Sequence, residues 1–105
     1  MKTIGTVGPS RYSRGGTIVV GYYHDGSIAL QITGMEGMEG KATVCLAPEG
    51  PTAKEGFCWL KGWSENEGLP EALEKAGIVK RTGETYPVGF PGAGLEAELA
   101  EIIVT

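Results

Sequence analysis

The sequence predicts an α+β domain: an antiparallel sheet of about five or six strands with one helix packed on one face. Two patterns indicate it. Short β-branched and aromatic runs are separated by turn residues, and one later stretch has helix-start residues with apolar spacings of three and four. Glycine supplies 18 of 105 residues, against a usual share of about 7%, which is typical of turns and bulges in a sheet-rich protein. The length suits a single domain spanning residues 1–105.

The clearest local signal is a hairpin around Asp25 and Gly26. Residues 17–23 are β-branched and aromatic, and a second apolar run begins at Ile28. Asp-Gly between two such runs predicts a two-residue type I′ turn, because both central residues need φ > 0. That turn places Tyr23 opposite Ile28. The resulting register puts five large apolar side chains on one face: Val19, Tyr23, Ile28, Leu30 and Ile32.

Residues 34–40 read GMEGMEG, a tandem copy of Gly-Met-Glu. This much glycine without helix caps predicts a flexible loop, either a neutral insertion or a contact surface. Met35 and Met38 are the contact candidates, since methionine adapts to irregular partners.

Residues 41–47 and 57–61 predict a second hairpin, in the register that places Cys45 opposite Cys58. Opposed residues of a non-hydrogen-bonded pair have Cα atoms about 4.5 Å apart, which permits a disulfide. In a cytoplasmic protein the same two residues are expected as reduced thiols, so both states stay open. This register gathers four apolar side chains on the opposite face: Val44, Leu46, Phe57 and Trp59.

A helix is predicted over residues 65–76. Ser64 and Glu67 have the spacing of a capping box, and Gly77 suits a left-handed helix end. Its outer face is predominantly acidic and contains Glu65, Glu67, Glu71, Glu74 and Lys75.

Three further segments are predicted as strands. Residues 2–7 alternate weakly, residues 85–90 form an edge interrupted by Pro87, and residues 95–104 alternate apolar with acidic side chains. Part of the last segment also fits a helix, but its β-branched end favours a strand with a bulge near Ala100.

The net charge of −4 is concentrated in residues 41–105, which contain six basic and ten acidic residues. No basic stripe is available to neutralise phosphates, so direct nucleic-acid binding is not expected. An acidic half suits a basic protein surface, although acids also simply keep a small domain soluble.

No catalytic, metal or cofactor site is expected. The one histidine, His24, lies in the predicted turn, where a solvated side chain lacks a positioned partner. The glycine-rich stretches match neither phosphate-binding pattern, and two cysteines without histidine fall short of a zinc site. The N-terminus shows no signal-peptide pattern and no run could span a bilayer, so the expected location is cytoplasmic.

Residues 63–79 read WSENEGLPEALEKAGIV, and residues 22–32 read YYHDGSIALQI. Both segments resemble an uncharacterised family of small bacterial proteins from conjugative elements, plasmids and phages. In that family a hairpin leads into an aromatic-Ser-Glu-Asn-Glu-Gly helix start. The resemblance implies no catalytic residues. It implies a setting in which small acidic proteins bind host proteins, as inhibitors of CRISPR–Cas effectors and restriction enzymes do.

The leading hypothesis is therefore a non-enzymatic inhibitor or regulator from a mobile genetic element, an anti-CRISPR or other anti-defence protein. Its partner is expected to be a bacterial defence complex with a basic groove. The residues expected to bind the partner are Glu65, Glu67, Glu71, Glu74, Glu96, Glu98, Glu101, Arg11, Tyr12, Arg14, Met35 and Met38. The alternative is a small-ligand or nucleotide-binding module that uses a sheet face with Tyr22, Tyr23 and Trp59.

Overall fold

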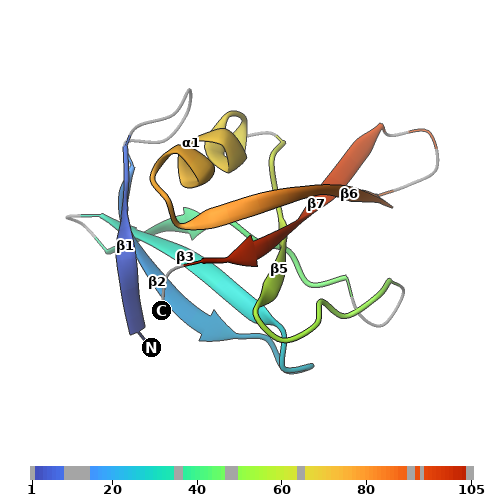
Figure 1. Cartoon of the computed structure of the whole chain (residues 1–105), viewed down its shortest axis with the longest axis horizontal. Coiled ribbons are helices and arrows are strands. Elements are labelled where there is room, and N and C mark those ends of the chain that lie inside the picture. Colours follow the sequence, from blue (N-terminus) through green and yellow to red (C-terminus); the bar gives the residue numbers. More distant parts are fainter. Residues whose placement is uncertain are drawn as a thin grey trace.

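The computed structural model describes residues 2–8, 15–34, 37–46, 50–63, 66–89, 92 and 94–103. These residues form antiparallel strands in two sheets and one short helix, an α+β architecture (Figure 1). The elements are β1 (Lys2–Val7), β2 (Gly16–Tyr22), β3 (Ile28–Gly34), β4 (Gly37–Lys41), β5 (Phe57–Leu60), α1 (Leu69–Lys75), β6 (Val79–Val88) and β7 (Leu95–Ile102). The prediction of a single sheet with five or six strands is wrong, because seven strands divide between two sheets.

The first sheet has the order β1-β2-β3-β4. The strand predicted at residues 2–7 is confirmed as β1. The loop predicted over residues 34–40 is wrong in part, because Gly37–Lys41 pairs with β3 as strand β4. The backbone of Met38 lies in this strand, whereas Met35 lies outside the described residues.

The β2–β3 hairpin forms, but its register differs by one residue from the prediction. Ile28 pairs with Tyr22 and not with Tyr23. The Gly26 N–H donates to Tyr23 O, and the Tyr23 N–H donates to Ser27 O, which defines a three-residue loop. Gly26, at φ 89°, supplies the left-handed residue that such a loop needs for its bulge.

This one-residue change reverses the face that β2 presents to the core. Ile18 is buried and Val20 packs against the core, whereas the prediction placed Val19 there. Ile28, Leu30 and Ile32 lie on the core face as predicted. The Asp25 side chain explains the longer loop, because it accepts hydrogen bonds from the backbone and hydroxyl of Ser27.

The chain passes from the first sheet to the second at Ala42 and Thr43. Ala42 N–H donates to Leu30 O of β3, and Thr43 forms a single bridge with Leu60 of β5. Thr43 Oγ1 also accepts the Leu30 N–H at 3.1 Å and contacts the Tyr23 hydroxyl at 3.0 Å. One threonine therefore bonds to both sheets and to the β2–β3 loop.

The second sheet has the order β5-β7-β6. The tail is a strand, as predicted, and β7 pairs with β5 on one side and β6 on the other. The irregularity lies near Ala100 as predicted, but the extra residues are in the neighbouring strand: β6 has them between Arg81, which pairs with Ala100, and Thr85, which pairs with Glu98. The predicted hairpin between residues 41–47 and 57–61 is reduced to the Thr43–Leu60 bridge, in the predicted register, because β7 takes the long pairing with β5.

Helix α1 is shorter than predicted. It begins after Gly68, which occupies the N-cap at φ 86°, and not after the predicted N-cap position 64. Ser64 and Glu65 lie outside the described residues. The predicted end is confirmed: Gly77 has φ 77°, its N–H donates to Glu74 O, and the next N–H donates to Leu73 O. This turn reverses the chain directly into β6.

Two groups of buried side chains hold the layers together. The first core lies between the two sheets and α1, and its buried members are Val7, Ile18, Leu30, Ile32, Ala42, Cys58, Leu60, Leu69, Leu73, Ile78, Val79 and Ala100. The second core covers the other face of the second sheet, with Leu46, Ala53, Trp59 and Ala97 buried. Val44 and Phe57 pack against it, which confirms the four-residue apolar face predicted for this region.

We predict that Thr43→Val destabilises the protein by about 1–3 kcal/mol, because the buried Leu30 N–H loses its acceptor while side-chain shape is kept. Tyr23→Phe is the matched control. It removes only the other hydroxyl of the same contact and should cost about 0.5–1.5 kcal/mol. Urea unfolding of the two variants measures the difference. Equal costs would contradict the role assigned to the Thr43 hydroxyl.

Candidate functional site

Three carboxylates converge on Arg81. The Arg81 Nη1 atom lies 3.0 Å from Glu71 Oε1 and 3.5 Å from Glu98 Oε1, and Nε lies 3.3 Å from Glu74 Oε1. The backbone N–H of Arg81 also donates to Glu74 Oε2 at 3.1 Å. Helix, β6 and β7 each contribute to this acidic cluster, defined by Glu71, Glu74, Glu98 and Arg81.

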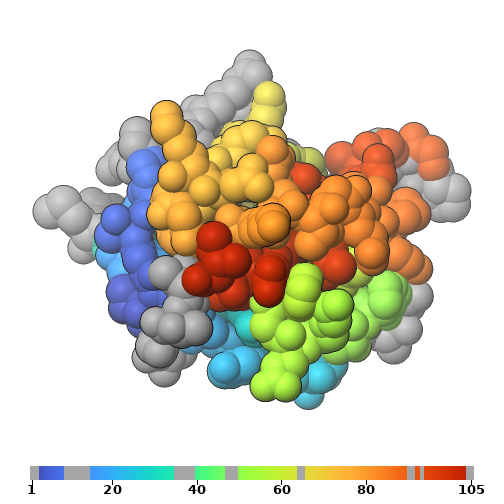
Figure 2. Space-filling view, viewed as in Figure 1, coloured from blue at the N-terminus to red at the C-terminus, as the bar shows by residue number. Residues whose placement is uncertain are grey.

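Local structure explains the convergence. Glu71 and Glu74 are three residues apart and share one helix face. The Gly77 turn leads from the helix into β6, where Arg81 lies, and Glu98 is on the neighbouring strand β7. Figure 2 shows α1 beside β6 and β7 on one face of the molecule.

The cluster keeps a negative surplus, since one guanidinium faces three carboxylates. Partial burial favours a lower Arg81 pKa, but Glu98, Glu71 and Glu74 outweigh it, so the pKa is raised. The Arg81 side chain is 29% exposed, and pairs in such positions add only about 0–1 kcal/mol each. The main effect of Arg81 is to fix where the carboxylates lie.

The predicted partner-binding residues are brought together only in part. Glu96 is exposed on the same face of β7 as Glu98 and contacts Thr85 Oγ1. Glu67 is exposed at the turn before the helix, and Glu101 is exposed on the opposite face of β7. Five predicted contact residues lie outside the described part of the chain: Arg11, Tyr12, Arg14, Met35 and Glu65.

Sequence reasoning missed Arg81, although it organises the predicted acids. The spacing of Glu71 and Glu74 identified a helix face, but no local pattern pairs that face with a residue beyond the helix stop. The usable signal was Gly77, because a left-handed helix end returns the chain toward the helix.

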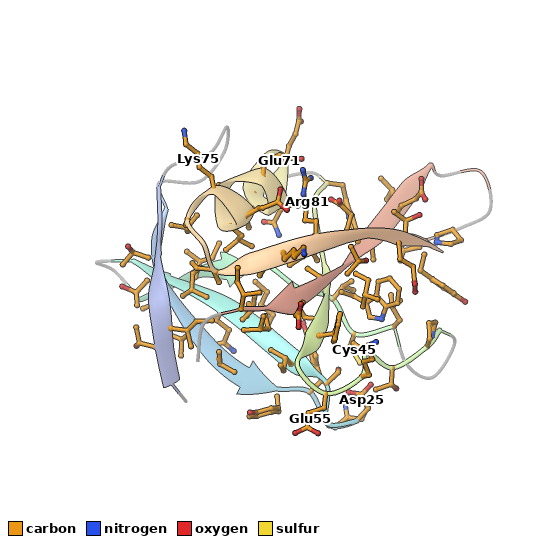
Figure 3. All side chains as sticks on the ribbon, in the orientation of Figure 1. Asp25, Cys45, Glu55, Glu71, Lys75 and Arg81 are labelled. Carbon is orange, nitrogen blue, oxygen red and sulfur yellow. The ribbon has the colours of Figure 1, made fainter. Side chains whose placement is uncertain are left out.

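A second polar cluster surrounds Asp25, which lies near the bottom of the molecule in Figure 3, whereas Glu71 and Arg81 lie near the top. Its carboxylate accepts hydrogen bonds from Ser27 N and Oγ, at 3.0 and 2.6 Å, and from Thr52 Oγ1 at 3.0 Å. The Cys45 thiol donates to Asp25 Oδ2 at 3.6 Å. These bonds tie the β2–β3 loop to the segment before β5. His24 is exposed in the same loop.

A pocket of about 440 Å³ opens between the segment before β5 and the end of β6. Its volume falls in the usual range of about 300–1,000 Å³ for ligand sites. The described lining residues include no charged side chain; they are Val44, Cys45, Leu46, Gly50, Tyr86, Pro87, Val88 and Gly89.

The aromatic face predicted for the alternative function is wrong. Tyr22 is 72% exposed at the end of β2, whereas Trp59 is 5% exposed inside the second core. Trp59 donates its Nε1–H to Pro51 O and packs edge-on against Tyr86, with ring centroids 6.1 Å apart. Tyr23 contacts Thr43 instead.

We predict that Asp25 contributes acid-sensitive stability. Hydrogen bonds to its carboxylate, chiefly from Ser27, lower the pKa of the Asp25 carboxyl from 3.8 to about 2 in the folded state. Because the folded pKa is the lower one, the contribution is complete above about pH 4 and is lost as the pH falls toward about 2. Urea unfolding between pH 2 and 6 should therefore show a steeper acid decline for the wild type than for Asp25→Asn. Parallel curves would contradict the prediction.

Among the described residues no group of three or more His, Cys, Asp or Glu side chains is placed to hold a metal ion. In this part of the chain no helix is long and apolar enough to cross a membrane. Comparison with known proteins finds no matching family model, no matching curated protein and no matching solved structure.

Proposed function

We propose that this protein is a non-enzymatic inhibitor or regulator that binds a basic surface of a protein partner. The partner class proposed is a bacterial defence complex, such as a CRISPR–Cas effector or restriction enzyme, whose nucleic-acid groove is basic. The resemblance of residues 63–79 to small proteins of mobile elements supports this class, and the surface charge supports the mode of binding.

The acidic cluster is the observation that carries the proposal. Glu71 and Glu74 remain exposed while Arg81 orients them, and Glu98 and Glu96 continue the negative surface along β7. Carboxylates held on a helix and a strand lose less side-chain freedom on binding than mobile ones. Opposite charges also accelerate encounter with the correct groove.

The test is to compare partner binding by a neutralised variant and a matched control. Glu71→Gln, Glu74→Gln and Glu98→Gln together remove the charges around Arg81 while keeping similar side-chain shapes. The control removes three exposed charges elsewhere: Glu55→Gln, Glu84→Gln and Glu101→Gln. Affinity for purified defence complexes and inhibition of their DNA cleavage are measured at low and high salt, and melting temperatures verify folding.

We expect the cluster variant to bind about tenfold more weakly or worse, with a smaller salt dependence, because it removes charge that faces the partner. The control should retain affinity and inhibition. An equal loss of affinity in both variants would indicate that binding depends on net charge and not on the acidic cluster. Inhibition unaffected by either variant, or absent against every complex tested, would refute the proposal.

The pocket favours small-molecule binding as a second candidate function. The described part of its lining is uncharged, which suits a neutral, largely apolar or aromatic ligand better than a nucleotide phosphate. Gly50 lies at its wall, and a Cβ there would come within 3.0 Å of Tyr86 Cε1 and 2.9 Å of Leu46 Cβ. A side chain at this position would therefore force Leu46 to shift and press on the Tyr86 ring, both of which line the pocket.

A thermal-shift screen of neutral aromatic metabolites tests this candidate. A ligand at 100 times its Kd should stabilise the protein by about 2.7 kcal/mol. Gly50→Ala should abolish that shift, whereas Gly40→Ala, where a Cβ meets nothing within 4 Å, should retain it. A shift that survives Gly50→Ala would place the ligand elsewhere, and no shift across the screen would count against this function.

A further inference from the structure

The two cysteines occupy matching positions on neighbouring segments. Thr43 bridges Leu60, and the flanking hydrogen bonds run from Val44 N to Trp59 O at 3.0 Å and from Lys61 N to Ala42 O at 2.8 Å. This pattern makes Thr43 and Leu60 a non-hydrogen-bonded pair. Cys45 and Cys58 each lie two residues beyond this bridge, at positions that a continuation of the register would set opposite each other, although the described pairing stops at the bridge.

Both cysteines also lie on the same side of these segments. Side chains alternate along extended chain, and Val44 and Trp59 pack into the second core. Cys58 lies on the opposite side, in the first core, and Cys45 contacts Asp25 away from the second core.

The Tyr23 hydroxyl interacts electrostatically with both cysteines. Its pKa is raised by burial, lowered by the hydrogen bond with Thr43, and raised further by the nearby Cys45, Cys58 and Asp25. Both thiols are therefore close enough to one hydroxyl to affect its ionisation. That hydroxyl lies 3.0 Å from Thr43 Oγ1, two residues from Cys45 in sequence.

The two thiols differ in access. Cys45 is half-buried and Cys58 is completely buried, and both are free thiols in this structure. Burial raises the pKa of Cys58 to about 12. An oxidant in solution therefore meets Cys45 first, and Cys58 can react only with a sulfur atom already inside the fold.

We propose that Cys45 and Cys58 are a reversible intramolecular disulfide site, closed by a low-molecular-weight disulfide such as oxidised glutathione. The Cys45 thiolate attacks one glutathione sulfur, forms a mixed disulfide and releases one glutathione thiolate. The Cys58 thiolate then attacks the Cys45 Sγ and releases the second. The protein loses two protons and two electrons, and the oxidised glutathione becomes two reduced glutathione molecules.

The cross-link would reinforce the point where, among the described residues, one backbone bridge joins the two sheets. It would close a covalent loop across the segment from Cys45 to Cys58 and restrict the unfolded chain. It would also withdraw the Cys45 thiol from Asp25, which keeps its stronger bonds to Ser27 and Thr52. Oxidation is thus compatible with the observed fold.

The test treats the folded protein with oxidised glutathione, blocks remaining thiols with iodoacetamide, and maps tryptic peptides without reduction. Cleavage after Lys41, Lys54 and Lys61 places Cys45 in peptide 42–54 and Cys58 in peptide 55–61. We expect these two peptides to be linked within one chain, and the link to disappear on adding dithiothreitol. The Cys58→Ser variant should stop at a glutathione adduct on Cys45, and Cys45→Ser should remain unmodified.

Two further readouts separate the site from incidental oxidation. Closure of the mixed disulfide should accelerate about tenfold per pH unit between pH 7 and 9, because the thiolate fraction of Cys58 rises in that proportion below its pKa. The linked form should also unfold at a higher urea concentration than the reduced form. Only a glutathione adduct in the wild type, links between different chains, or an unchanged urea midpoint would overturn the proposal.

Discussion

The structure depends on how Thr43 joins the two sheets. Its backbone bridges Leu60 in the second sheet, and its hydroxyl accepts the Leu30 N–H of the first. Without this contact the first core would lie between sheets that no backbone bridge connects among the described residues. A buried donor is costly to leave unpaired, so the small polar side chain is as restrictive as the apolar residues around it. The Tyr23 hydroxyl also contacts Thr43 Oγ1, which connects the β2–β3 loop to the same residue.

Sequence patterns predicted most of the strands, because alternation and turn residues are local signals. They also predicted the Thr43–Leu60 register, because setting Cys45 opposite Cys58 gathers Val44, Leu46, Phe57 and Trp59 on one face. The β2–β3 register was wrong because Asp25 bonds Ser27 and adds a residue to the loop. The choice of β7 as partner of β5 was not predictable either, as it depends on pairing across the whole chain.

In the candidate site too, the local features were predicted and those that depend on the whole fold were not. The acidic helix face was predicted from spacing alone, even though the helix begins at Leu69 and not at residue 65. Its organisation by Arg81 was not predicted, because the arginine reaches Glu71, Glu74 and Glu98 only through the fold. Arg81 lowers the charge of the surface while fixing its shape. For binding a basic groove, fixed carboxylate positions with a smaller negative charge favour specificity over the strength of electrostatic attraction.

Strand β7 keeps the two candidate surfaces separate. Glu98 faces Arg81 and Ala100 enters the first core, whereas Ala97 and Leu99 face the second core. Because side chains alternate along a strand, the acidic cluster and the Tyr86 pocket lie on opposite faces of one sheet. A substitution on one face need not disturb the other except through the shared backbone. Loss of partner binding with an intact pocket, or the reverse, would therefore identify which face the protein uses.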